Sequence, residues 1–163
     1  MVLVRNAIMM LAALGVLAAC QSTPPPPPPT IVQLTVEAAA DVNPDAAGRP
    51  SPVLVRVYEL TSPAGFAGAD FFQLFEQDQA VLGADLVARD DLTLEPGETQ
   101  TLTKEIDPRT QFLGIMAAYR DIDGSVWRAT VAVPPNQTTA VTATIGATAV
   151  SVSAMPVAPP PGS

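Results

Sequence analysis

The stretch Ile31-Val32-Gln33-Leu34-Thr35-Val36-Glu37 alternates between apolar and polar side chains. From Val32 to Val36 every second residue is apolar, and the residues between them are polar. Successive side chains of a β-strand point to opposite faces, so this period of two is typical of a strand with one buried face. We therefore expect a strand over residues 31–39.

The same period recurs along the chain. Residues 99–106 have a polar residue at every odd position, with Leu102 and Ile106 on the other face. Strands are expected at residues 31–39, 52–60, 86–94, 99–106, 112–120, 126–133 and 138–152. Turn sequences separate several of them: Pro96-Gly97, Asp123-Gly124 and Pro134-Pro135-Asn136. Many short strands joined by turns predict an all-β fold, either a sandwich or a barrel.

One segment departs from the β pattern and predicts a small helical insertion. Asp70 can cap a helix, and Gln73 follows at the spacing of a capping box. Phe71, Leu74 and Phe75 would then share one helix face. Two roles remain open for this aromatic face, which either packs on the sandwich or contacts a partner. We also expect one more pair of aromatic residues, Tyr119 and Trp127, in or beside the sandwich core.

The N-terminus has the features of a lipoprotein signal peptide. Residues 7–19 carry no charge, and this run is shorter than the roughly 20 apolar residues of a spanning helix. It ends in Leu17-Ala18-Ala19-Cys20, small residues followed by the single cysteine of the chain. This pattern predicts cleavage before Cys20 and lipidation of its thiol; the alternative is an ordinary secreted protein with an unrelated cysteine. Gln21, in place of Asp, favours sorting to the outer membrane.

Four regions follow from these signals. We expect a signal peptide at residues 1–19, a lipid anchor and proline-rich linker at 20–30, a β-sandwich at 31–152 and a disordered Pro-rich tail at 153–163. The linker contains six consecutive prolines, which as polyproline II form a stiff spacer of about 19 Å. A Pro-rich ligand for a partner domain is the alternative role of this run.

Composition excludes several classes of function. Removing residues 1–19 removes Arg5 and changes the net charge from −8 to −9. Such an acidic domain would be repelled by nucleic acid and by anionic lipid headgroups. Histidine is absent, which leaves no Ser-His-Asp triad and no typical zinc site. We expect no enzymatic activity, no cofactor and no metal.

The sequence contains two pairs of nearby aspartates. Asp90 and Asp91 are neighbours in an expected strand, so their side chains point to opposite faces and do not form a catalytic pair. Asp121-Ile122-Asp123-Gly124 resembles the start of a calcium loop but lacks the later ligands, so a turn is the better interpretation.

A string of motifs resembles the TssJ family (VasD/SciN-like), the outer-membrane lipoproteins of type VI secretion. The motifs are Val55-Arg56-Val57-Tyr58-Glu59-Leu60, Ala69-Asp70-Phe71-Phe72-x-Leu74-Phe75, Leu82-Gly83-x-Asp85-Leu86, Leu94-x-Pro96-Gly97-Glu98, Gly114-Ile115-x-Ala117-Ala118-Tyr119-Arg120-Asp121 and Trp127-Arg128. Their order and spacing, together with the Cys20 pattern, cover about residues 31–150.

The resemblance implies both fold and role. It implies a transthyretin-like two-sheet β-sandwich with a small helical addition, tethered by lipid to the periplasmic face of the outer membrane. The implied role is structural, because such a lipoprotein holds the periplasmic C-terminal region of the inner-membrane protein TssM and, through it, TssL. Two other classes remain open: a periplasmic ligand-binding or chaperone-like sandwich, and an enzyme on a sandwich scaffold.

The connection between the first two expected strands is the candidate partner site. It is longer than a hairpin needs and rich in Pro, Gly, Asn and Asp, so we expect an irregular, exposed loop. The resemblance implies that this loop contacts TssM. The candidate residues are Val42, Asn43, Pro44, Asp45, Ala46, Ala47, Gly48, Arg49 and Pro50. Arg49, the one cation among them, is the expected charged anchor, with Asn43 and Asp45 as polar contacts at the rim. A merely solvated connection is the alternative, and the helical segment is the alternative surface.

Overall fold

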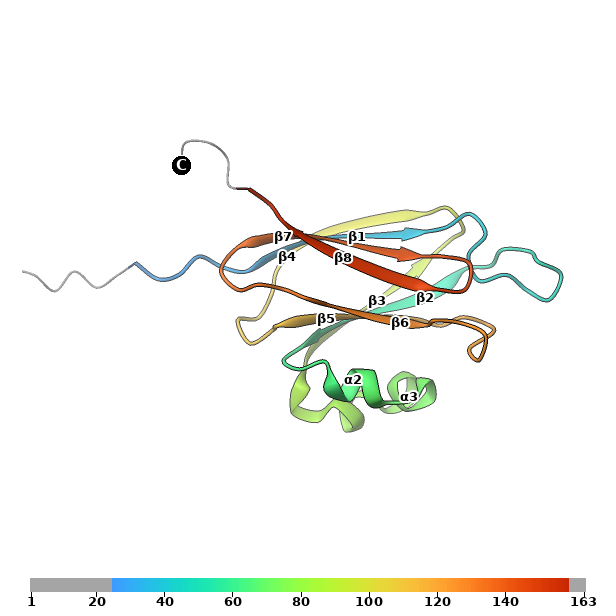
Figure 1. The fold of residues 1–163 in the computed structure, drawn as a ribbon, viewed down its shortest axis with the longest axis horizontal. Helices are drawn as coiled ribbons and strands as arrows, with labels where there is room; N and C mark the ends of the chain where they lie inside the picture. Colours follow the sequence, from blue (N-terminus) through green and yellow to red (C-terminus); the bar gives the residue numbers. More distant parts are fainter. Residues whose placement is uncertain (1–24, 159–163) are drawn as a thin grey trace, which may run out of the picture.

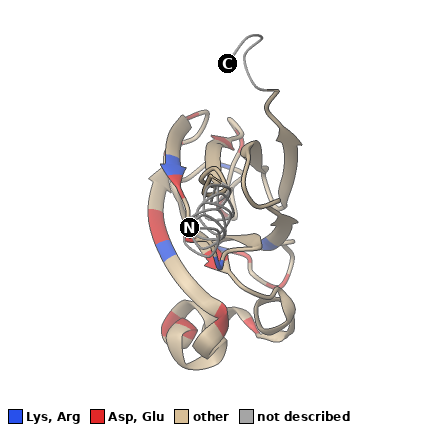
Figure 2. Cartoon of the chain, turned by 90° about the vertical axis from the view of Figure 1, so that its left-hand side faces the viewer, with Lys and Arg blue, Asp and Glu red and all other residues tan. Residues whose placement is uncertain are grey.

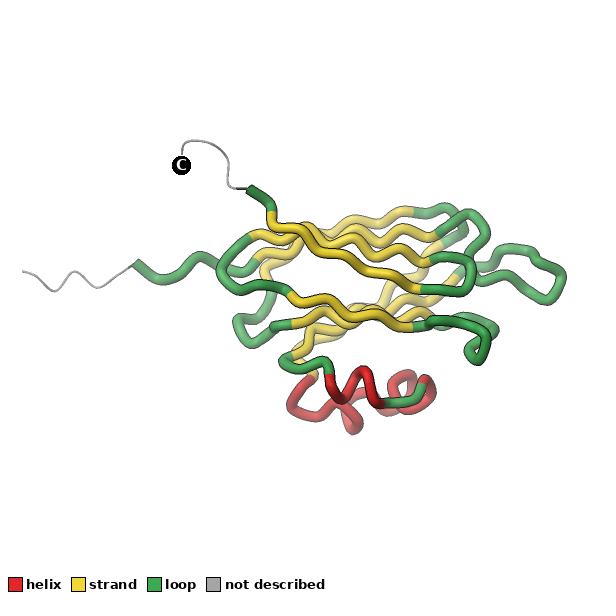
Figure 3. The backbone as a smooth tube through the Cα atoms, in the orientation of Figure 1, coloured by secondary structure: helices red, strands yellow, loops and turns green. Residues whose placement is uncertain are grey.

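The computed structural model describes residues 25–158, which form two stacked β-sheets with a layer of short helices beneath one of them (Figure 1). The predicted all-β sandwich with a small helical insertion is confirmed. Figure 3 shows the strands running between two sets of loops at opposite ends of the sandwich.

The first sheet has the strand order β4-β1-β7-β8. Its strands are β1 (Ile31–Ala38), β4 (Thr99–Glu105), β7 (Thr138–Ile145) and β8 (Val150–Pro156). β1 pairs parallel to β7 and antiparallel to β4. The alternation expected in the opening stretch is confirmed, because Val32, Leu34 and Val36 are buried against the second sheet.

The second sheet is antiparallel and has the order β3-β2-β5-β6. Its strands are β2 (Val53–Leu60), β3 (Leu86–Leu94), β5 (Phe112–Ala117) and β6 (Arg128–Ala132). β2 is buried on both faces: Val55 and Val57 belong to the sandwich core, whereas Tyr58 and Leu60 belong to a separate cluster beneath the sheet.

That second cluster is covered by the helices α2 (Ala64–Gly68) and α3 (Phe71–Leu82), followed by a 3-10 turn, η1 (Gly83–Asp85). Asp70 and Gln73 form the predicted capping box. Phe71 and Leu74 are buried as predicted, and Phe75 is partly buried against the same cluster. The aromatic face therefore packs on the sheet of the sandwich, which is the first of the two roles considered for it.

Gly114 lets α2 approach the sheet closely. A Cβ atom on this residue of β5 would come within 3.1 Å of the Phe66 ring and of Leu60. Phe66 is fully buried there, with its ring centroid 5.3 Å from that of Tyr58. Arg128 donates from Nη1 to the carbonyl oxygens of Phe66 and Ala69, which satisfies the end of α2.

Charged groups are arranged differently on the two faces of β3. Asp90 faces the edge between the sheets and pairs with Lys104 at 2.8 Å, and Lys104 also pairs with buried Glu59 at 2.8 Å. Asp91 lies on the other face, near Arg56 and Arg89. The prediction that Asp90 and Asp91 diverge is confirmed. In Figure 2 the helices at the bottom carry acidic residues and no basic ones.

Three expected boundaries are corrected. Residues 138–152 form two strands rather than one, because the chain turns back after Ile145 and pairs β7 with β8. β8 continues to Pro156, so a disordered tail from residue 153 is wrong for residues 153–156. Residues 118–127 form a long connection instead of strand ends and a tight hairpin. Tyr119 is buried in the core and Trp127 packs beside it, as predicted.

Different segments of the chain extend from the two ends of the sandwich. Residues 25–30 enter β1 from one end, and the β1–β2 loop projects from the opposite end (Figure 1). The β5–β6 and β7–β8 connections lie at the same end as that loop. We call this the loop end.

Candidate partner-binding site

The base of the β1–β2 loop is buried and held by Asn43. Its backbone N–H donates to the Ala147 carbonyl at 3.1 Å, and its side-chain Nδ2 donates to the Pro52 carbonyl at 2.8 Å. Its Oδ1 accepts from the backbone N–H of Arg120 at 2.8 Å. Asn43 thus joins three of the connections at the loop end, two through its side chain and one through its backbone N–H. Asn43 also has φ = 49°, a left-handed conformation that asparagine tolerates better than most residues.

These contacts correct the expected role of two candidate residues. Val42 and Asn43 are 0% and 4% exposed, so neither belongs to the exposed tip of the loop. The idea that Asn43 offers a polar contact at the rim is wrong, because its side-chain oxygen and nitrogen are used inside the protein. Asn43 is a structural residue that positions the rest of the loop.

The tip of the loop is an ordered turn from Asp45 to Arg49. The Asp45 N–H donates to the Arg49 carbonyl, and the Gly48 N–H donates to the Asp45 carbonyl, at 2.9 and 2.8 Å. Gly48 has φ = 77°, which favours glycine. Asp45 Oδ1 also accepts from the backbone N–H groups of Ala47 and Arg49. The tip therefore has a defined shape before any partner arrives.

Arg49 is bound to its own loop. Its Nε and Nη2 lie 2.8 and 2.7 Å from Asp45 Oδ2. Hydrogen bonds from the Arg49 backbone, and then from its guanidinium, hold the pKa of Asp45 below its ordinary value. Arg49 remains highly exposed, but its charge is already neutralised by Asp45. The exposed part of the candidate loop is residues 46–50.

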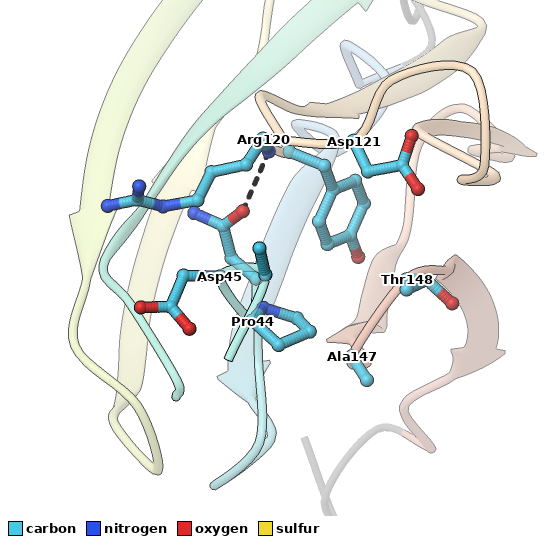
Figure 4. Close-up of a pocket in the computed structure, with 9 residues that line it drawn as sticks. Pro44, Asp45, Arg120, Asp121, Ala147 and Thr148 are labelled. Carbon is cyan, nitrogen blue, oxygen red and sulfur yellow. Dashed lines mark hydrogen bonds between the residues drawn. The ribbon is translucent and has the colours of Figure 1, made fainter. Parts of the chain in front are cut away.

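A cavity of about 480 Å³ opens beside this loop (Figure 4). Residues 43–46 form one wall, residues 119–121 a second and residues 147–148 a third. The Tyr119 hydroxyl donates to the Gly146 carbonyl at 3.1 Å, which ties the second wall to the third. Burial raises the pKa of the Tyr119 phenol, which therefore stays neutral.

Arg120 is a residue of this site that the sequence analysis did not select. Its backbone N–H is bound by Asn43, while its side chain extends from the cavity wall and is exposed (Figure 4). Within residues 25–158, its guanidinium has no ion pair and no hydrogen bond. Sequence contained one signal, the family motif Ala117-Ala118-Tyr119-Arg120-Asp121, but no indication that these residues meet the β1–β2 loop.

The helical layer offers less free surface. Leu74 and Phe66 are fully buried and Phe71 is nearly so, which leaves Phe72 as an exposed aromatic side chain at 62%. Arg56 donates from Nη1 to the Phe75 carbonyl at 2.6 Å, near the interruption of α3 at Gln77. Most groups that could contact a partner here are already used.

The remaining candidate features are a metal site, a membrane-spanning helix and the lipidated cysteine. Between residues 25 and 158 there is no group of three or more Asp, Glu, His or Cys residues positioned to hold a metal. Asp121 Oδ1 accepts from the Gly124 N–H at 3.0 Å, which is the geometry of a turn. Over the same residues, no helix is both long and apolar enough to span a membrane. Cys20, the predicted lipidation site, lies outside the described residues.

Comparison with known proteins identifies similar chains. A family model described as type VI secretion lipoprotein (VasD, EvfM, TssJ) matches residues 30–148. The crystal structure of the T6SS lipoprotein TssJ1 from Pseudomonas aeruginosa is 40% identical with a TM-score of 0.77, over 80% of this chain and 100% of that chain. Serratia marcescens Lip, a membrane-bound component of the type VI secretion system, is 28% identical with a TM-score of 0.70, over 80% and 99%.

A third similar chain comes from the structure described as T6SS protein TssM C-terminal domain (869-1107) from EAEC. It is 27% identical, has a TM-score of 0.60, and the match covers 74% of this chain and 98% of that one. No curated protein matches the sequence.

Proposed function

The chain belongs to the TssJ (VasD) family of type VI secretion lipoproteins, and from that premise we propose that it anchors the secretion system's membrane complex to the outer membrane. In this role it binds the periplasmic C-terminal region of a TssM-like inner-membrane protein, and through it TssL. The family is structural and is not a known enzyme family, which agrees with a chain that has no histidine.

The observation that carries this proposal is the position of the ordered loop tip. Residues 25–30 leave one end of the sandwich and the tip projects from the other (Figure 1). A lipid on Cys20 would therefore place the anchor and the tip at opposite ends of the domain. Long loops held by a rigid sandwich are common binding surfaces, and this tip is held by the Asp45 hydrogen bonds. The similarity to a chain in a TssM C-terminal domain structure also supports a TssM partner.

Lipid anchoring is the second part of the proposal. Small residues before a single cysteine support cleavage and lipidation at Cys20, and the acidic domain offers no electrostatic route to anionic lipid. One acyl chain binds a membrane only marginally, so two or three are expected. Labelled palmitate should be incorporated by the full-length protein and not by a Cys20→Ser variant; labelling that persists in the variant would place the anchor elsewhere.

The partner site can be tested at the tip without disturbing its base. Deleting residues 46–48 retains Asn43 and its three hydrogen bonds, so the domain should fold with an unchanged melting temperature. Ala47→Glu adds a charge to the same exposed tip. Isothermal titration calorimetry with the periplasmic C-terminal region of TssM should show at least about a tenfold loss of affinity for the deletion, because contacts at an interface centre dominate binding.

Pro135→Glu is the matched control for Ala47→Glu. Pro135 is also exposed, but it lies in the β6–β7 connection at the end from which residues 25–30 leave. Its substitution adds the same charge and should leave the affinity unchanged. If the wild-type domain fails to bind TssM, the proposed function is wrong. If it binds and both tip variants bind equally well, the helical layer around Phe72 becomes the site to test.

A further inference from the structure

We infer that the cavity at the loop end is the second half of the partner surface, and that it receives an acidic side chain of the partner protein on Arg120. This inference rests on the proposed function and adds the chemistry that the partner must present. It also moves the charged anchor from Arg49, where the sequence placed it, to a residue on another connection.

Most cations of the described chain already have a partner within the protein. Arg49, Arg56, Arg89, Lys104 and Arg109 each form an ion pair with a carboxylate of this protein. Arg128 donates to two helix carbonyls and lies over the Trp127 ring. Among residues 25–158, Arg120 is the cation with neither kind of partner.

Within the part of the chain that the structure describes, the nearby carboxylates do not form an ion pair with the Arg120 guanidinium. Asp45 is held by the Arg49 guanidinium and by two backbone N–H groups, and Arg120 acts on it only through a weaker charge interaction without an ion pair or hydrogen bond. Asp121 accepts from the Gly124 N–H in its own turn. An arginine guanidinium presents a planar fork of donors that matches a carboxylate in two hydrogen bonds. A carboxylate from outside the chain is therefore the group that would complete this site.

The cavity supplies the space for such a contact. Its volume of about 480 Å³ lies within the range of ligand pockets and can admit side chains of a docking segment. Pro44, Ala46 and Ala147 give it apolar walls, and the Arg120 side chain extends to the side of the cavity where Asp45 lies (Figure 4). The occupant that fits is therefore a partner segment with a Glu or Asp next to an apolar side chain.

The walls are positioned before binding. Asn43 joins the β1–β2 loop to Arg120 and to Ala147, and the Tyr119 hydroxyl joins the second wall to Gly146. A surface already held in its binding shape loses less conformational entropy when a partner docks. Since the domain as a whole is acidic, this single pair would contribute to specificity and complex lifetime more than to the rate of encounter.

The test is a charge reversal with a matched control at the opposite end. Arg120→Glu changes the side chain only, so the backbone N–H that binds Asn43 remains. Arg109→Glu makes the same change in net charge at an exposed site in the β4–β5 connection, where Arg109 pairs with Asp107. Arg120→Lys retains the charge without the planar fork. Thermal unfolding of each variant establishes that the domain is folded before binding is measured.

Binding to the periplasmic C-terminal region of TssM is measured by calorimetry at two salt concentrations. Arg120→Glu should lower the affinity at least about tenfold and make it less sensitive to salt, because a charge pair at the interface is lost. Arg120→Lys should give an intermediate loss. Arg109→Glu should remain within about twofold of wild type, because exposed charges far from an interface are screened.

Three results would overturn the inference. If Arg120→Glu binds like wild type while the 46–48 deletion does not, the cavity is not part of the surface, and the proposed function stands. If Arg109→Glu loses as much affinity as Arg120→Glu, the effect is general electrostatics. If the wild-type domain does not bind TssM at all, both the inference and the proposed function are wrong.

Discussion

The helical layer and the loop end of the sandwich use their side chains in opposite ways. In the helical layer, Tyr58 and Phe66 are fully buried, and Arg56 and Arg128 donate hydrogen bonds to the carbonyl groups of helix residues. At the loop end, one buried residue, Asn43, holds the connections together, while the tip is exposed. Groups satisfied within the chain stabilise the fold, whereas exposed groups on a fixed frame remain available to a partner. Variants in the first region should affect stability, and variants in the second should affect binding.

The largest expected effect is on stability, from Phe66→Ala in the helical layer. Phe66 is 0% exposed and fills the space that Gly114 leaves against the sheet. Truncation of a buried Phe should lower the free energy of unfolding by about 3–5 kcal/mol, measured by chemical denaturation. Below its melting temperature the variant should still bind TssM.

Phe72→Ala is the control for this prediction, because Phe72 lies in the same layer but is 62% exposed. Its unfolding free energy should change by no more than about 0.5 kcal/mol. Equal destabilisation by the two variants would show that the layer does not pack as described. Loss of binding in Phe72→Ala alone would move the partner surface to the helices.

A smaller effect is expected at the base of the loop, and it should combine both kinds of change. Asn43→Ala removes the acceptor of the Arg120 N–H and the donor to the Pro52 carbonyl, and leaves a residue other than asparagine at φ = 49°. The cost in unfolding free energy should be about 1–3 kcal/mol, because buried polar groups lose their partners. Hydrogen exchange at the Arg120 amide should become faster.

Asn43→Asp separates the two contacts. The carboxylate still accepts from the Arg120 N–H but cannot donate to the Pro52 carbonyl, so exchange at the Arg120 amide should stay slow. Unchanged protection of that amide in Asn43→Ala would mean that Asn43 does not hold the loop end together.

The smallest effect is expected from Tyr119→Phe, which removes the hydrogen bond to the Gly146 carbonyl. A cost of about 1 kcal/mol at neutral pH is typical of such a bond. Burial raises the pKa of Tyr119 in the folded protein, so the folded state retains the phenolic proton more strongly than the unfolded state. The contribution of Tyr119 to the free energy of unfolding is therefore fully present below the unfolded pKa of about 10. It is lost as the pH rises through the folded pKa of Tyr119.

Tyr119→Phe should accordingly lose less stability than wild type as the pH is raised above about 10. Thermal unfolding over that range measures the difference. Tyr58, whose pKa is also raised by burial, remains in the variant, so part of the alkaline dependence should persist. Identical alkaline profiles would show that Tyr119 is not buried in its neutral form.

Local sequence patterns predicted most of the architecture. The alternation from Val32 to Val36 was sufficient for β1, because one face of that strand is buried and the other is not. The Asp70–Gln73 capping box depends only on residues of one helical turn, and it is present as predicted. The end of β7 was missed because the alternation of Thr, Ala and Val continues almost unbroken through the turn at residues 146–149.

The sequence by itself determined the strand periods, the helix cap, the acidic charge and the exposed turn residues of the β1–β2 loop, since each depends on neighbouring residues. The tertiary structure decided the roles of Asn43 and Arg120. Arg49 is neutralised by a residue four positions away, whereas the backbone of Arg120 is held beside the same loop by a hydrogen bond across 77 residues of sequence. Contacts between distant segments decide which polar groups have partners within the protein and which remain free. The local alternation of apolar and polar residues contains no information on those contacts.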